Sequence, residues 1–177
     1  MSNAQYLASL VNSSGNIVLP VSNGGVVFNP STVGTGTVSS NTMSDYETGT
    51  WTPALSKGGA TFSYSFQNGY YTKTGNIVYV IASLQWLSVS GGSGTVSITG
   101  LPFTCSNGNN NYSQGSCNDF AGWNFADSGT MLGMEFTKNN TVCAPISNRN
   151  GSGTATGVSS INSSGYIYFA GFYQAQF

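Results

Sequence analysis

Apolar and polar residues alternate with a period of two along much of the chain after residue 44. The pattern is clearest in residues 75–87, where one face of a strand would carry Val78, Val80, Ala82, Leu84 and Trp86. The opposite face begins with Ile77, Tyr79 and Ile81, so we expect the first half of this strand to be buried on both sides. Such a strand is typical of the centre of a sandwich, or of a sheet that a neighbouring subunit covers.

Three later segments have strand patterns as well. In residues 130–136 the apolar residues fall on alternate positions, and residues 138–140 (Lys-Asn-Asn) form a turn sequence. Residues 141–146 would return as the antiparallel partner, although Pro145 restricts that strand to an edge or a strand end. The last segment, 166–177, is aromatic-rich, and one of its faces would carry Ile167, Phe169, Tyr173 and Phe177.

Glycine and asparagine turns separate these short strands, and no window gives a convincing helix. Hydrophobic residues make up 39% of the chain, which is enough for one modest core. The sequence therefore predicts an all-β protein, with an antiparallel β-sandwich or jelly-roll domain over residues 45–177.

Residues 1–44 have a different character, because they contain no charged side chain and are interrupted by Gly, Ser, Asn and Pro. Their short apolar clusters, at residues 17–19 and 26–28, are too small to bury themselves and too apolar to prefer water. We expect an extended N-terminal arm that becomes ordered against a partner and attaches the protein to a larger particle. The competing interpretation makes these clusters the first strands of the body.

Only nine of the 177 side chains are charged, and Ser, Thr, Asn and Gly together fill half of the chain. Because histidine is absent, Ser-His-Asp and Cys-His catalysis and all His-containing metal sites are excluded. A net charge of −1 without a basic cluster argues against nucleic acid as a partner. No apolar run approaches the ~20 residues of a membrane helix, and residues 1–7 lack the features of a secretory signal, so we expect no membrane association.

The three cysteines, Cys105, Cys117 and Cys143, cannot form a complete set of disulfides. Cys105 and Cys117 flank an Asn/Gly/Ser-rich stretch and could close that loop in an oxidising medium. The alternative is three buried or unreactive thiols. Their irregular spacing, without histidine, predicts no structural metal, and no cofactor is expected.

Residues 41–53, N-T-M-S-D-Y-E-T-G-T-W-T-P, resemble a motif of bacteriophage tail-fibre and related virion-appendage proteins whose usual form is N-T-L-D-D-Y-E-E-G-T-W-T-P. Residues 69–78 and 98–103 fit the same family pattern in the expected order, so the resemblance covers about residues 41–103. The departures are Met43, Ser44 and Thr48, which reduce the charge of the motif. The resemblance implies a homotrimeric virion protein assembled in the cytoplasm of a bacterial host.

The motif also has a physical interpretation. Asp45 and Glu47 are two residues apart and project to one side of an extended chain. Carboxylates so close on one strand cannot straddle a glycosidic bond as glycosidases require. We expect them instead to accept backbone N–H bonds or to pair with Lys57 or Lys73 at the junction between arm and body. Tyr46 and Trp51 would anchor that junction by packing.

Taken together, these features predict a trimeric surface appendage of the tail-fibre or knob type that contacts host-surface glycans. A surface of Ser, Thr, Asn and Tyr offers hydrogen bonds and aromatic contacts to polyhydroxylated ligands. The candidate glycan contacts lie in and just beyond the loop at residues 106–118 and are Asn109, Asn110, Asn111, Tyr112 and Trp123. The alternative for this loop is a flexible surface segment without a ligand.

Two other functions stay open. In the first, the chain is a capsid decoration (cement or head-fibre) protein whose N-terminal arm binds the major capsid protein. The short segment before the motif favours this alternative. In the main prediction, the partners are instead tail or baseplate proteins. In the second, it is a polysaccharide-degrading enzyme, for which only Asp119, Asp127 and Glu135 remain as candidate carboxylates. Without histidine or a G-x-S-x-G motif, we expect no enzymatic activity.

Overall fold

The computed structural model describes residues 26–27, 42–43, 45–108, 113–124, 131–148 and 156–176. These residues form strands and turns and include no helix, and hence no helix that could cross a membrane. The strands are β1 (Val26–Val27), β2 (Thr42–Met43), β3 (Tyr46–Trp51), β4 (Ala54–Ser56), β5 (Thr61–Thr74), β6 (Ile77–Ser90), β7 (Ser97–Thr99), β8 (Ser113–Asn124), β9 (Met131–Phe136), β10 (Val142–Asn148), β11 (Thr156–Gly157) and β12 (Ser160–Gln174). The all-β class predicted from the sequence is confirmed.

The chain divides into two units, Met1–Tyr46 and Glu47–Phe177. In the first unit, β1 and β2 form an antiparallel pair with Val26 opposite Met43. This pair is a sheet of its own, so β1 is not a strand of the main sheet. The remainder of the predicted arm lies outside the described residues, and the division at residues 44 and 45 stays a prediction.

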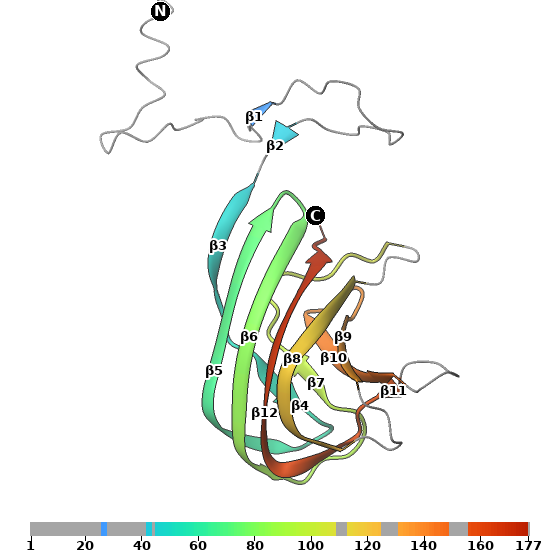
Figure 1. The fold of residues 1–177 in the computed structure, drawn as a ribbon. Helices are drawn as coiled ribbons and strands as arrows, with labels where there is room; N and C mark the ends of the chain where they lie inside the picture. The colour runs from blue at the N-terminus through green and yellow to red at the C-terminus, as the bar shows by residue number, and fades with distance from the viewer. Residues whose placement is uncertain are drawn as a thin grey trace, which may run out of the picture. The chain divides into compact units, whose positions relative to one another are not determined.

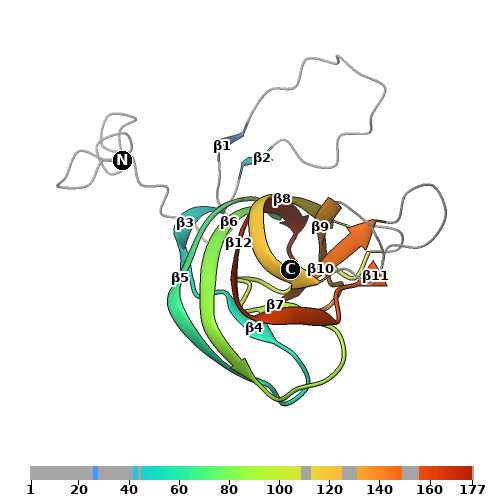
Figure 2. The same cartoon turned by 60° about the horizontal axis from the view of Figure 1, so that its bottom comes forward.

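The body is one ten-stranded sheet in the order β3-β5-β6-β12-β8-β9-β10-β7-β4, with β11 beside β10. The sheet curls on itself, as Figures 1 and 2 show. Its two end strands, β3 and β4, follow each other directly in the sequence. Only Thr52 and Pro53 separate β3 from β4. Two side chains of β5 reach this connection: Gln67 donates to the Pro53 carbonyl at 2.8 Å, and the Tyr64 hydroxyl accepts from the Leu55 amide at 2.7 Å.

Three long antiparallel strands, β5, β6 and β12, form a continuous wall of this sheet (Figure 1). β5 and β6 are a hairpin in which Thr74 lies opposite Ile77. The two residues between them are Gly75 and Asn76, and Gly75 has a φ of 59°, a left-handed conformation that glycine adopts without strain. The predicted strand at residues 75–87 is therefore present from Ile77 onward, and its first two predicted residues, Gly75 and Asn76, form the turn instead.

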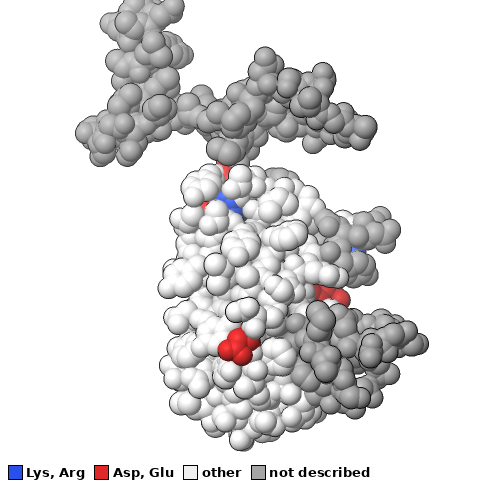
Figure 3. Space-filling model, viewed as in Figure 1, with Lys and Arg blue, Asp and Glu red and all other residues white. Residues whose placement is uncertain are grey.

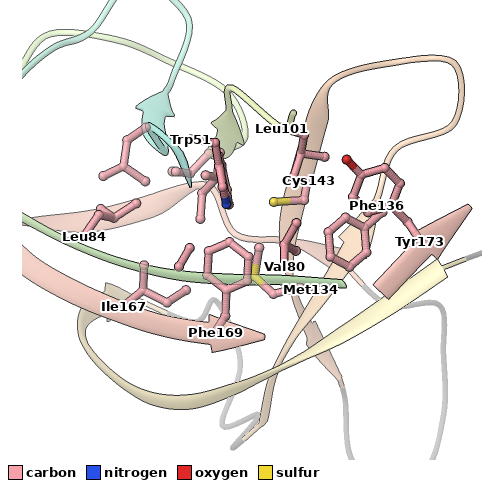
Figure 4. Packing of buried hydrophobic residues seen from close by; sticks show 14 of the residues in the cluster. Trp51, Val80, Leu84, Leu101, Met134, Phe136, Cys143, Ile167, Phe169 and Tyr173 are labelled. Carbon is pink, nitrogen blue, oxygen red and sulfur yellow. The ribbon is translucent and has the colours of Figure 1, made fainter. Parts of the chain in front are cut away.

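The core lies on the inner face of the curled sheet (Figure 4). β6 contributes the alternating set predicted for it, all of which is buried: Val78, Val80, Ala82, Leu84 and Trp86. β12 contributes Ile167, Phe169 and Tyr173, as predicted, whereas Phe177 lies outside the described residues. Aromatic pairs connect the strands, since Phe136 stacks on Tyr173 with ring centroids 5.1 Å apart. The period-two pattern therefore identified the buried face correctly.

The outer face of β6 differs from the prediction. Ile77, Tyr79 and Ile81 are 46%, 45% and 46% exposed in the single chain, whereas a second layer of the same domain would bury them; coverage by a neighbouring subunit, the other alternative, stays a prediction. The physical reason is that the body is a single curled layer, so that one side of each strand faces the core and no other part of the described body covers the other.

The predicted hairpin at residues 130–146 is confirmed, with a correction at Pro145. β9 and β10 pair over six residues, and Asn139 in the turn has a left-handed φ of 53°. Pro145 lies inside β10 rather than at an edge or end, opposite Met134. On the side of β10 that faces away from β9, the pairing of β10 with β7 ends at Cys143 and its pairing with β11 begins at Ile146. The missing N–H of Pro145 faces this gap, so no ladder hydrogen bond is lost.

Candidate functional site

A hollow of about 220 Å³ lies where β3 and β5 run side by side. It is lined by Thr50, Trp51, Thr52, Gln67, Asn68, Gly69 and Tyr70. Thr50, Thr52, Asn68 and Tyr70 are exposed, whereas Trp51 and Gly69 are buried. Because side chains alternate between the faces of a strand, the four exposed side chains form the walls on the outer face, and the backbone between them forms the floor.

Gly69 is required for this arrangement. A Cβ atom at Gly69 would come within 2.5 Å of Trp51 Nε1 and 2.6 Å of the Trp51 carbonyl oxygen. Without that atom the Trp51 indole lies against β5 on the inner face and contacts Phe169 edge-on, with ring centroids 6.3 Å apart. The Trp51 N–H is buried and has no hydrogen-bond partner among the described residues.

The walls of the hollow carry hydroxyl and amide groups and no charge. Thr50 and Thr52 can each donate and accept a hydrogen bond, and the Asn68 amide can do both at once. Tyr70 is 59% exposed and presents an aromatic ring at the border of the hollow. The hollow therefore offers uncharged hydrogen-bonding groups and one exposed aromatic ring.

An apolar surface adjoins the hollow on the outer face of the β5–β6–β12 wall. Tyr70 lies opposite Ile81, and Tyr79 lies opposite Phe172, which is 60% exposed. In Figure 3, which views the molecule from the side of this wall, the surface is mostly uncharged, with a few charged groups at its upper end and isolated charged groups elsewhere.

The residues predicted to join arm and body occupy separate environments. Asp45 and Tyr46 are exposed, and Asp45 has a left-handed φ of 67°. The Glu47 carboxylate accepts a hydrogen bond from the Tyr71 hydroxyl at 3.1 Å. Partial burial, together with this carboxylate, raises the pKa of Tyr71. Trp51 packs in the core of the body, so its large ring stabilises the sheet itself.

Of the two lysines suggested as partners of these carboxylates, Lys57 is partly exposed and Lys73 is buried. Lys73 is 8% exposed, and its Nζ lies 5.3 Å from the centre of the Phe103 ring, a cation–π contact. Sequence reasoning did not indicate Tyr71 as the partner of Glu47, because 24 residues separate the two and only the pairing of β3 with β5 brings them together.

The predicted glycan contacts are either undescribed or buried. Asn109, Asn110, Asn111 and Tyr112 lie outside the described residues. The structure places Trp123 in the core and not on the surface: it is 7% exposed and packs edge-on against Trp86, with ring centroids 5.4 Å apart. Its indole N–H donates to the Tyr166 carbonyl at 3.1 Å, so both the ring and its polar group have partners within the protein.

All three cysteines are described, and all are free thiols in this structure. The disulfide between Cys105 and Cys117 in an oxidising medium stays a prediction. Burial raises the pKa of Cys105 to about 11 and that of Cys117 to about 12, and it raises the pKa of Cys143 well above its usual range. Protonated thiols are weak nucleophiles and poor metal ligands at neutral pH. No group of three or more metal-ligating side chains occurs among the residues that the structure describes.

Among the carboxylates considered for catalysis, Asp119 is exposed on β8 and accepts a hydrogen bond from the Tyr166 hydroxyl at 3.2 Å. This bond raises the pKa of Tyr166, so the phenol stays protonated at neutral pH. Glu135 lies on β9 opposite Gln114, and Asp127 is outside the described residues. Neither Asp119 nor Glu135 lines the hollow.

No protein-family model and no curated protein sequence matches this chain. Among solved structures, the crystal structure of the Dettilon tailspike protein (gp208) matches it with a TM-score of 0.60 and 20% sequence identity. The match covers 74% of this chain and 24% of the tailspike chain, so the matched part of this chain spans about a quarter of that protein's length. At this identity the match establishes similarity of fold.

Proposed function

We propose that this chain is part of a bacteriophage tail appendage whose β-domain contacts neutral glycans on the host surface. Two observations support the tail appendage: the fold resembles that of a phage tailspike, and residues 41–53 resemble the tail-fibre motif. The hollow between β3 and β5 carries the proposed glycan contact, because it is uncharged and lined by hydroxyl, amide and phenol groups.

The size and chemistry of the hollow favour a sugar. Its volume of about 220 Å³ is below the roughly 300–1,000 Å³ typical of sites that enclose drug-sized ligands, which fits a single ring of a longer chain. Sugar hydroxyls would exchange hydrogen bonds with Thr50, Thr52 and Asn68, while the apolar face of the ring packs on Tyr70. No lining residue is a carboxylate, which supports a binding role and not a hydrolytic one.

Binding of the full-length protein to an array of bacterial surface polysaccharides tests this site. We expect wild-type protein to bind at least one polysaccharide and the Tyr70→Ala and Asn68→Ala variants to bind it about tenfold more weakly or worse, a change of about 1.4 kcal/mol. Tyr46→Ala is the matched control, since Tyr46 is 64% exposed and does not line the hollow. Equal losses for Tyr46→Ala and Tyr70→Ala, or no bound polysaccharide, would contradict the glycan contact.

We further propose that the protein acts as a homotrimer in the virion, together with other tail or baseplate proteins. Antibodies raised against the protein, applied to intact virions and viewed by electron microscopy, test its location. The expected result is labelling of the tail. Labelling of the capsid would contradict the tail assignment and favour a capsid decoration protein.

A further inference from the structure

We infer that copies of this chain associate through the outer face of β5, β6 and β12. The contact surface, called here the outer patch, consists of Ile77, Tyr79, Ile81 and Phe172; Tyr70 lies at its border and belongs to the hollow. This inference deepens the proposed homotrimer by naming its contact face, and it does not depend on glycan binding.

The outer patch is continuous, because its members are neighbours across strands. Ile81 of β6 lies between Tyr70 of β5 and Ala170 of β12. Two residues along β6, Tyr79 lies directly opposite Phe172. Side chains opposite each other on one face of a sheet are close enough to touch, so these residues present one apolar surface and not isolated exposed side chains.

The exposed area of the patch is large for a surface left in water. Its members are between 45% and 60% exposed, and full burial of one aromatic side chain removes about 150–250 Å². The four residues together therefore expose on the order of 400 Å², which is within the range of the largest apolar patch of a monomer. A stable interface covers about 800 Å² per partner, and the adjoining Thr72, Thr74 and Gln174 on the same face supply further area.

The chemistry of the patch favours another copy over a sugar or a charged partner. Ile77, Ile81 and Phe172 have no group that can hydrogen-bond a sugar hydroxyl. No member of the patch is charged, and Lys73, at the end of β5, is buried instead of lying on this face. An uncharged face neither attracts a charged partner nor repels its own copy. If the patch points toward a three-fold axis, the same face is buried in all three subunits at once.

Light scattering coupled to size-exclusion chromatography of the full chain tests this inference. We expect a trimer for the wild type and a shift to monomer for Ile81→Asp and Phe172→Asp. Ser90→Asp is the matched control, because Ser90 is exposed on the same strand roughly 30 Å from Ile81, at 3.3–3.4 Å per residue. Circular dichroism spectra identical to that of the wild type would show that the monomeric variants are folded. A wild-type monomer, or variants that remain trimeric, would overturn the inference.

Thiol labelling of the assembled protein provides a second test that places no charge in the patch. The native thiols give little background, because burial keeps their pKa values high. Maleimide should label Ser90→Cys quickly and Ile81→Cys slowly in the native trimer, and both quickly in denaturant. Equal labelling of the two in the native protein would show that the patch is open and overturn the inference. Slow labelling of Ile81→Cys in a protein that is monomeric would place another part of the same chain on the patch and overturn it as well.

Discussion

Glycines in the strands decide where aromatic rings can lie. A Cβ atom at Gly165 would lie 2.4 Å from the Trp86 ring, and one at Gly171 would lie 2.7 Å from the Phe136 ring. Glycine usually weakens a strand because it has no side chain to pack. Here the ring of a residue on another strand fills that space, as Trp51 does over Gly69. These glycines therefore determine the packing of the core.

Gly69→Ala should destabilise the protein by about 1–3 kcal/mol, because the added methyl group would overlap Trp51 and its carbonyl oxygen. Urea denaturation measures the loss. Gly133→Ala is the matched control: Gly133 is also a strand glycine, but the nearest atom to an added Cβ there is 3.4 Å away. We expect this control to change stability by less than about 1 kcal/mol. Equal losses in the two variants would contradict the proposed role of Gly69.

The short strand β4 is the last strand of the curled sheet. Backbone pairing joins it to β7 on one side, and a side-chain hydrogen bond joins it to β5 on the other. It has three residues and pairs with β7 through Ala54–Thr99, Leu55–Ile98 and Ser56–Ser97. On its other side the Tyr64 hydroxyl of β5 accepts a hydrogen bond from the Leu55 amide at 2.7 Å. One side chain thus takes the place of a strand ladder where the sheet closes.

Tyr64→Phe should leave the Leu55 amide without an acceptor and loosen β4. We expect the protein to lose about 1–3 kcal/mol of stability and the Leu55 amide to exchange with deuterium faster than in the wild type. Tyr70→Phe on the same strand is the control, since the Tyr70 side chain is exposed. Unchanged exchange at Leu55 would show that β7 alone holds β4 in place.

In the whole body, two outer surfaces with different chemistry lie side by side. The hollow beside β3 is polar and uncharged, and the outer patch on β6 and β12 is apolar and uncharged. Tyr70 lies at the border between them, on the side of the hollow. With so few charges in the chain, neither surface relies on ion pairs, and both are expected to function similarly at low and high salt.

Buried neutral thiols make the folded protein sensitive to alkali. Thiols of the unfolded chain ionise near pH 9.0, whereas burial holds the folded pKa values of Cys105 and Cys117 at about 11 and about 12. The unfolded state therefore releases protons first, and stability falls as the pH rises above 9.0, by about 1.4 kcal/mol per pH unit for each such thiol.

Urea denaturation under reducing conditions between neutral pH and pH 11 measures this dependence. Stability should be nearly constant below pH 8 and should decline above pH 9. In the Cys117→Ala variant the decline should be shallower, because one of the contributing thiols is gone. Identical slopes for variant and wild type would assign the decline to other groups, such as the buried Tyr173, whose pKa burial also raises.

The sequence by itself determined the inner face of the strands that it predicted, but it did not predict β5 or β8, and it placed residues 113–118 of β8 in a loop. A strand places alternate side chains on opposite sides, so local order alone shows that Val78, Val80 and Trp86 share a face. The turn at residues 138–140 was equally local, since Asn139 occupies a left-handed position that its residue type favours. Gly75, which the sequence placed in the strand, belongs instead to the turn before β6.

The tertiary structure alone decided what covers each face and which distant residues meet. Trp123 is an aromatic residue of the kind that an exposed ligand contact would use. It is buried because β8 pairs with β12 and the Trp123 ring packs against Trp86. Tyr79 alternates with core residues just as the sequence showed, yet it is exposed because the body is one curled layer. The hollow exists only because β3 and β5 are neighbours, and strand pairing between separated segments depends on the global fold and not on local periodicity.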